Sequence, residues 1–92
     1  MADVVVTLRI MPSDVDVNLE HVFNAAKKKI VAFAGMDNMK KEVVPVAFGL
    51  KSLNLIFVMD EKKGSTDTLE SDISGIDGVE SVEVTDVRRT IG

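Results

Sequence analysis

The chain has 92 residues and a mass of 10.0 kDa, so residues 1–92 are expected to form a single domain. It contains no cysteine, which excludes disulfides, thiolate zinc sites, iron–sulfur clusters and a cysteine nucleophile. Its 11 basic and 15 acidic residues give a net charge of −4, which argues against a broad interaction with the phosphates of nucleic acid. No apolar run approaches the ~20 residues of a membrane-spanning helix, and the opening MADVVVTLRI lacks the features of a signal peptide. These properties predict a small, acidic, cytoplasmic protein without a membrane segment.

Hydrophobic periodicity predicts the first two elements. Apolar residues alternate with polar ones over Asp3–Met11, which indicates a strand with one buried face. Between Leu19 and Phe33, apolar residues recur at three- and four-residue steps, which indicates an amphipathic helix. Asp16 or Asn18 can cap the start of this helix, and Gly35 can end it.

The middle of the chain predicts two more strands. Val43–Leu50 is rich in β-formers, and Pro45 places it at the edge of a sheet because proline has no N–H for the ladder. Leu53–Met59 is almost continuously apolar, as in a strand that is buried on both sides or lies in the middle of a sheet. Asp60–Gly64 follows as a charged turn.

The last third of the chain predicts a short helix and a final strand. Any of the polar residues 65–67 can cap the helix, which buries Leu69, Ile73 and Ile76. The final strand covers Val79–Arg88. Val82 and Val84 share one face of this strand and Val87 is out of phase with them, so a bulge or bend is expected near Thr85-Asp86.

The resulting order βαββαβ contains two crossovers, both of which should be right-handed. This leaves one compact arrangement, an α+β ferredoxin-like sandwich. Its four-stranded antiparallel sheet has the strand order 4-1-3-2, with both helices on one face. The fold serves many unrelated functions, so function has to be sought in particular residues.

The sequence offers little material for catalysis, and we expect no catalytic residues, no metal site and no cofactor. The single histidine, His21, borders the apolar stripe of the first helix and is favoured as a boundary residue over a metal ligand. The carboxylates Glu80, Glu83 and Asp86 are favoured as a solvated strand face over a metal cluster. Neither G-x-x-x-x-G-K-[ST] nor G-x-G-x-x-G occurs. The protein is therefore not expected to be an enzyme.

RNA recognition on this fold needs aromatic residues on the central strands, where they stack on bases. Here the two central strands contain only Phe57. An acylphosphatase-like loop is also missing, because residues 11–16, MPSDVD, are acidic. Both functions are therefore disfavoured.

Two segments remain as candidates for contact with a partner. Phe48 stands beside Gly49 near a hairpin turn and either folds into the core or projects as an anchor for a pocket of another protein. Arg88 and Arg89 either reach an anionic group of another molecule or keep the end of the chain soluble. From the residues alone, both alternatives stay open.

These segments also carry a resemblance to a known family. PVAFGLKSLN, the strand LIFVMD and the ending SGIDGVESVEVTDVRR closely resemble the archaeal form of translation elongation factor 1-beta. The resemblance covers essentially the whole chain. It implies a guanine-nucleotide exchange domain that acts on elongation factor 1-alpha, the GTPase that carries aminoacyl-tRNA. As a free protein, the domain is expected to be a monomer.

Residue by residue, Phe48 and Gly49 match the family's Pro-x-x-Phe-Gly segment, in which the phenylalanine is presented to the GTPase. Thr85 and Asp86 match the Thr-Asp of the family's final strand. Eukaryotic members have a lysine beside the C-terminus, near the magnesium of the GTPase, whereas this chain ends in Thr90-Ile91-Gly92. Either Arg88 or Arg89 replaces that lysine, or the magnesium site is disturbed without a cation.

A second hypothesis comes from another class of function, a ligand-sensing regulatory domain of the same fold. Such a domain would self-associate through the face of the sheet that no helix covers. Val5, Thr7 and Arg9 lie on that face of the first strand and form no evident ligand cluster. A dimer that responds to metabolites would favour this hypothesis over nucleotide exchange.

Overall fold

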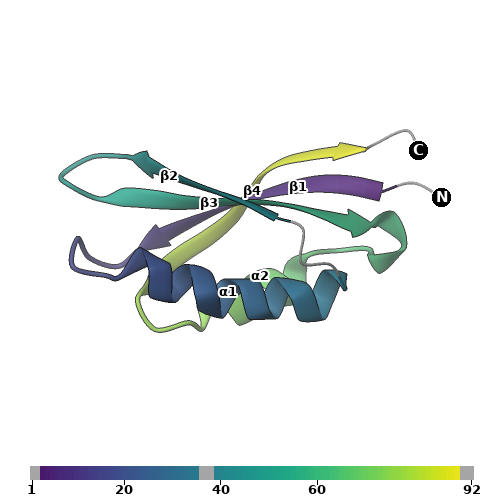
Figure 1. Ribbon diagram of the computed structural model, residues 1–92, viewed down its shortest axis with the longest axis horizontal. Coiled ribbons are helices and arrows are strands. Elements are labelled where there is room, and N and C mark those ends of the chain that lie inside the picture. Colours follow the sequence, from purple (N-terminus) through teal and green to yellow (C-terminus); the bar gives the residue numbers. More distant parts are fainter. Residues whose placement is uncertain (1–2, 36–38, 90–92) are drawn as a thin grey trace.

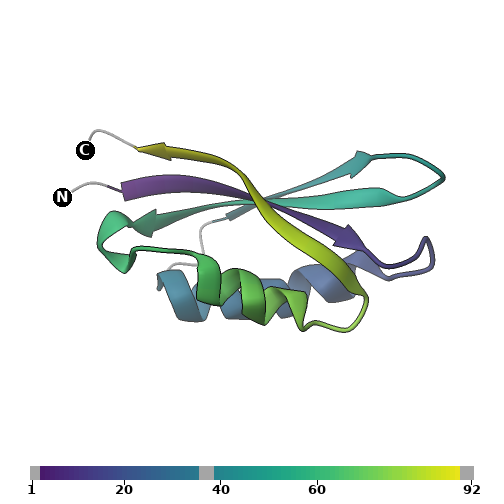
Figure 2. The same cartoon turned by 180° about the vertical axis from the view of Figure 1, so that it is seen from behind.

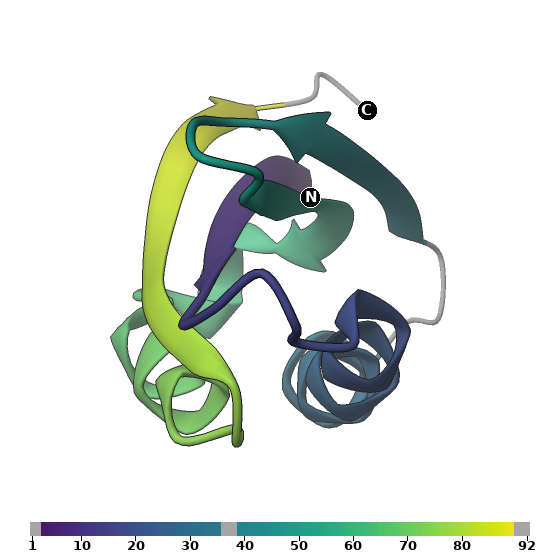
Figure 3. The ribbon, with the colours of Figure 1, turned by 90° about the vertical axis from the view of Figure 1, so that its left-hand side faces the viewer.

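The computed structural model describes residues 3–35 and 39–89. Its elements, in chain order, are β1 (Asp3–Pro12), α1 (Leu19–Ala34), β2 (Met39–Pro45), β3 (Lys51–Asp60), the 3-10 helix η1 (Glu61–Lys63), α2 (Asp67–Ser74) and β4 (Val79–Arg89). The strands form one antiparallel sheet in the order β2-β3-β1-β4. Both helices lie on the same side of this sheet, as Figures 1, 2 and 3 show. The predicted α+β ferredoxin-like sandwich is therefore confirmed.

The core lies between the helices and the two central strands, β1 and β3. Val6 of β1 is opposite Phe57 of β3, and Leu8 is opposite Leu55. The helix-facing apolar residues of both strands are fully buried except Val4, which is half-buried, and the residues of the opposite face are mostly half-buried. The prediction that β3 lies in the middle of the sheet is confirmed. The alternative prediction, that β3 is buried on both sides, is wrong, because within the described residues no element covers the face of the sheet opposite the helices.

The helix α1 is held at both ends by specific hydrogen bonds. The side-chain oxygen of Asn18 accepts from the backbone N–H groups of Glu20 and His21, at 3.0 and 3.2 Å. Asn18, and not Asp16, is therefore the cap. At the other end Gly35 has a left-handed conformation and donates its N–H to the carbonyl of Val31, at 2.8 Å. This is the geometry in which glycine ends a helix at the lowest cost.

The helix α2 lies beside α1 and covers the part of the sheet near β4. It buries Leu69 and Ile73 in the core, and Ile76 packs against the core from just beyond the helix. The Ser65 hydroxyl accepts from the Asp67 N–H at 3.0 Å, and the Thr66 hydroxyl donates to the Glu70 carboxylate at 2.8 Å. The expected burial of Leu69 and Ile73 is thus confirmed, whereas Ile76 lies beyond the end of the helix and is half-buried.

The strand β2 differs from its prediction in both boundaries. It covers Met39–Pro45 and not Val43–Leu50. Pro45 is the last residue that pairs with β3, opposite Lys51, and residues 46–50 form the loop of the hairpin. The edge position predicted from Pro45 is confirmed, since β3 is the only strand that pairs with β2 in the described sheet.

Candidate functional site

The β2–β3 hairpin ends in a tight turn that contains Phe48. The Leu50 N–H donates to the Ala47 carbonyl at 3.0 Å, and the Val46 N–H donates to the Leu50 carbonyl at 2.8 Å. The two central residues of the turn, Phe48 and Gly49, have φ angles of 56° and 80°. Positive φ at both central residues is characteristic of a type I′ turn, which matches the twist of the strands that it joins.

Phe48 is unfavourable at this position for two reasons. It is the one non-glycine residue with a positive φ in the described part of the chain, a conformation that costs an ordinary residue about 1–2 kcal/mol. Its side chain is also 97% exposed, so the ring contributes nothing to the core. Asn or Asp would suit the first central position better. The interpretation of Phe48 as a core residue is therefore wrong, and strain retained at an exposed residue suggests a functional role.

Other apolar side chains surround the base of this turn. Val15, in the loop between β1 and α1, is 54% exposed, and Val46 is 43% exposed. Gly49 packs beside this loop: a Cβ atom on Gly49 would lie 3.5 Å from Cγ1 of Val15. Val15, Val46 and Phe48 are called the hairpin-tip patch below. Val15 is not among the contact residues predicted from the sequence, although an apolar residue among the polar residues of the PSDVDV segment is a usable signal.

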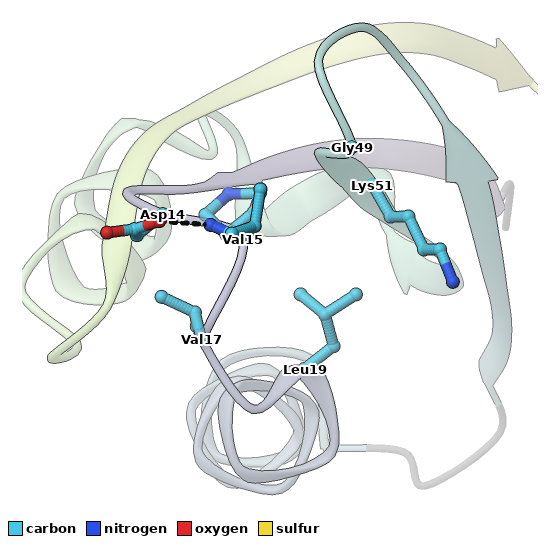
Figure 4. A pocket seen from close by; sticks show the side chains of 7 residues that line it. Asp14, Val15, Val17, Leu19, Gly49 and Lys51 are labelled. Carbon is cyan, nitrogen blue, oxygen red and sulfur yellow. Dashed lines mark hydrogen bonds between the residues drawn. The ribbon is translucent and has the colours of Figure 1, made fainter.

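A hollow of about 310 Å³ opens beside the hairpin tip. Figure 4 shows apolar side chains pointing into it from the β1–α1 loop and from the start of α1. Its lining residues come from two segments that are distant in the sequence: Pro12, Asp14, Val15, Val17, Leu19, Gly49 and Lys51. Val15 belongs to the hairpin-tip patch as well. The hollow and the hairpin-tip patch are therefore one continuous surface.

The strand β4 carries the second group of predicted contact residues, and it contains a bulge. Thr7 of β1 pairs with Asp86, whereas the next residue, Leu8, pairs with Val84. Thr85 is therefore the extra residue, and its hydroxyl donates to the Thr7 carbonyl at 3.5 Å. The bulge expected near Thr85-Asp86 is confirmed.

The bulge corrects the phase of the apolar residues of β4. Val82 and Val84 lie opposite Ile10 and Leu8, on the side that faces the helices. Because of the bulge, Val87 lies on this side too, opposite Val6. One inserted residue thus keeps Val87 on the same side of the strand as Val82 and Val84.

The two arginines at the end of β4 lie on opposite faces of the sheet. Arg88 is opposite Val5, on the open face, and its Nε donates to the Asp86 carboxylate at 2.8 Å. Arg89 is on the helix-facing side, where its Nε and Nη2 donate to the two oxygens of Glu61, at 2.8 and 2.9 Å. Both arginines therefore have partners within the chain, and the bidentate pair joins β4 to η1.

The structure does not bring the two groups of predicted residues together. Phe48 and Gly49 belong to the β2–β3 hairpin at one end of the sheet, whereas the end of β4, which carries the two arginines, lies toward the other end (Figure 1). Thr85 and Asp86 lie between them, near the middle of β1. The molecule is 42 Å along its longest axis and about half as wide. A partner that touches both groups must therefore extend along the sheet. Residues 90–92, where the family's lysine would stand, are outside the described part of the chain.

The remaining candidates from the sequence are placed without forming a site. Phe57 is 1% exposed and faces the helices, so it is not available to stack on a base. His21 is an exposed residue of α1. In residues 3–35 and 39–89, no group of three or more His, Asp or Glu side chains is arranged to hold a metal ion. No helix in those residues is both long enough and apolar enough to cross a membrane.

The open face of the sheet is mixed in character. Val5, Thr7 and Arg9 are half-buried there, and Arg9 lies 3.9 Å from the Glu83 carboxylate. A shallow hollow of about 260 Å³ lies at its β2 side, lined by Val5, Met39, Lys40, Ile56 and Val58. The charged groups Arg9 and Glu83, and Arg88 and Asp86, pair with each other on this face, and the hollow itself is lined mostly by apolar side chains.

Comparison with known proteins gives one consistent result. The sequence profile of the EF-1 guanine nucleotide exchange domain matches residues 5–90. The chain is 40% identical over 89 residues to elongation factor 1-beta of Methanothermobacter thermautotrophicus, covering 97% of this chain and 98% of the relative. It is 42% identical to elongation factor 1-beta of Methanobrevibacter smithii, with the same coverage of both chains.

A solved structure of a hypothetical protein from Staphylococcus aureus is similar in fold alone. Its TM-score is 0.62 with 11% identity, and the similarity covers 100% of this chain and 25% of that one. The family assignment therefore depends on the sequence comparisons, in which the match extends over nearly the full length of both chains. The chain belongs to the EF-1 guanine nucleotide exchange domain family.

Proposed function

We propose that this protein promotes the replacement of GDP by GTP on elongation factor 1-alpha during translation elongation. Membership of the exchange-domain family supports this function. The structural observation that carries it is Phe48, whose ring is 97% exposed on a backbone with φ of 56°. A residue that lowers the stability of its own turn and gains nothing from its own core is suited to bind a pocket of another protein.

Exchange on this proposal is a matter of differential binding. A GTPase holds its nucleotide tightly because the phosphates and magnesium order its switch segments. A factor that binds the nucleotide-free conformation better than the loaded one lowers nucleotide affinity by the same ratio. Phe48, at the hairpin end of the sheet, supplies part of that preference by inserting its ring into a pocket of the GTPase. No covalent bond is made or broken, so the protein accelerates exchange without being an enzyme in the chemical sense.

The end of β4 makes the second contact in this proposal. Arg88 is the arginine that reaches the partner, because its guanidinium lies on the open face and makes one hydrogen bond, through Nε, to Asp86. Arg89 has both of its bonded nitrogens on Glu61 and instead fixes the end of the strand. Thr85 and Asp86 set the direction and charge of the segment from which Arg88 projects, and Gly49 allows the turn that presents Phe48.

The proposed partner is the GTPase alone. The protein acts in the cytoplasm as a monomer when free, without direct contact with nucleic acid or membrane. Its net charge of −4 supports the absence of a phosphate-binding surface. Sedimentation of the purified protein at increasing concentration tests whether the free protein is a monomer.

Release of a fluorescent GDP analogue from the cognate elongation factor 1-alpha tests the function. A catalytic amount of the wild-type protein should accelerate release and reach the same endpoint. Phe48→Ala should remove an anchor contribution of about 2 kcal/mol or more, which is about 30-fold in affinity for the GTPase. Unchanged release with the wild-type protein would contradict the proposed function, and normal exchange by a folded Phe48→Ala would contradict the role of Phe48.

A further inference from the structure

The hollow beside the hairpin tip borders the turn that contains Phe48, and the proposed role of Phe48 does not use it. We propose that it receives an apolar side chain of elongation factor 1-alpha, and that Lys51 at its rim pairs with a carboxylate of the same GTPase. This inference rests on the proposed function, because it assigns the hollow and Phe48 to one partner. The contact would then be reciprocal, with one apolar side chain inserted from each protein.

The shape of the hollow suits a single side chain. Its volume of about 310 Å³ is roughly ten times the ~30 Å³ that one molecule occupies in liquid water. It stands at the lower limit of the ~300–1,000 Å³ of small-molecule sites. Val17 and Leu19 form apolar walls and pack against the core, so these walls are fixed by the fold (Figure 4).

The position of the hollow identifies which partner covers it. Gly49, the residue after Phe48, lines it, and the Gly49 backbone lies against the exposed Val15. A protein that encloses the Phe48 ring must therefore approach the mouth of the hollow as well. Val15 is more than half exposed at this mouth, and its burial would add apolar contact to the same interface.

The charges at the rim specify the chemistry of the partner. Asp14 and Lys51 lie on opposite sides of the hollow (Figure 4). One Asp14 oxygen accepts the Val15 N–H at 2.6 Å, so this carboxylate helps to shape the loop. Lys51 is exposed and forms no ion pair with the described residues. The geometry therefore points to an apolar side chain of the GTPase with a carboxylate within reach of Lys51.

Val15→Asp tests the hollow, because it places a charge at the mouth without cutting into the core. The control is Val43→Asp, which changes another exposed valine, 44% exposed, that does not line the hollow. Thermal unfolding should show that both variants fold. In titrations with nucleotide-free elongation factor 1-alpha, Val15→Asp should bind about tenfold or more weakly. Val43→Asp should bind as the wild type does.

Lys51→Gln tests the carboxylate of the partner separately. Loss of a peripheral charge should slow association by about threefold at low salt and have little effect at high salt. Binding by Val15→Asp and Lys51→Gln equal to the wild type, while Phe48→Ala is impaired, would overturn this inference and leave the proposed function intact. If the wild-type protein does not accelerate release, the proposed function fails, and the same binding titrations still decide whether the hollow is contacted. Absence of any binding to the GTPase would overturn both.

Discussion

At the hairpin end of the sheet, apolar side chains lack partners within the chain, whereas at the β4 end the charged side chains have them. Phe48 is fully exposed on a strained backbone, with Val15 beside the turn. Arg88 and Arg89, in contrast, hydrogen-bond to Asp86 and Glu61. On the proposed function, binding through the hairpin end breaks no ion pair of the free protein, while contact through the β4 end requires existing ion pairs to be exchanged.

This difference has an energetic consequence. Burying an exposed phenylalanine gains the full transfer free energy of the ring, about 1.5–3 kcal/mol. Exchanging one surface ion pair for another is close to neutral, because such pairs contribute about 0–1 kcal/mol. Affinity for the GTPase should therefore come mainly from the hairpin end. The β4 end should mainly affect orientation and the rate of association.

The largest effect should come from Phe48→Asn, which changes stability and function in opposite directions. Asn suits the first central position of a type I′ turn, so the variant should unfold at higher denaturant concentration, with a gain of about 1 kcal/mol. Loss of the ring should still weaken binding to the GTPase by about 30-fold. Urea unfolding and GDP-release assays on the same preparation measure both.

Phe57→Ala is the matched control for this comparison, since Phe57 is 1% exposed in the core. It should lower the free energy of unfolding by about 3–5 kcal/mol. A Phe48→Asn variant that is destabilised, or that exchanges normally, would show that Phe48 belongs to the fold and not to the interface.

Substitutions of the two arginines should have effects of intermediate size, one on exchange and the other on stability. Arg88→Ala removes the charge on the open face and should reduce exchange by about fivefold, with little change in stability. Arg89→Ala breaks the pair with Glu61 and should lower the free energy of unfolding by about 0.5–1 kcal/mol. Chemical denaturation and exchange assays, run at low and high salt, give both values. Equal loss of exchange in the two variants would mean that Arg89 does more than hold the strand.

Much of this fold follows from local patterns in the sequence. The periods of apolar residues place the helices and strands, Pro45 places β2 at the edge, and the phase of Val87 reveals the bulge. Each of these signals acts within one element or between neighbours in the chain. That is why they are readable without coordinates.

The parts that could not be predicted depend on unusual or distant residues. The sequence does not show where β2 ends, because a Phe-Gly turn lacks the Asn-Gly or Asp-Gly signal that normally marks a type I′ hairpin. The hollow joins residues 12–19 to residues 49–51, and no local pattern shows that these segments meet. Arg88 and Arg89 lie on opposite faces because consecutive residues of a strand alternate, but which of them lies on the open face depends on the register of β4, which the bulge shifts.

The smallest effect is expected from deleting Thr85, and it tests whether the β4 end depends on its direction or only on its charge. Without Thr85, the remaining residues of the strand alternate regularly, with Val84 and Val87 still on the helix-facing side and Asp86 and Arg88 still on the open face. The pairs with β1 can therefore persist, and stability should change by less than about 1 kcal/mol. What the deletion removes is the bend that a bulge gives to a strand. A two- to threefold loss of exchange, about 0.5 kcal/mol, with unchanged unfolding would show that the bulge aims Arg88 at the partner. Unchanged exchange would mean that the bulge serves only to keep Val87 on the helix-facing side. The β4 end would then contribute to exchange through its charge alone.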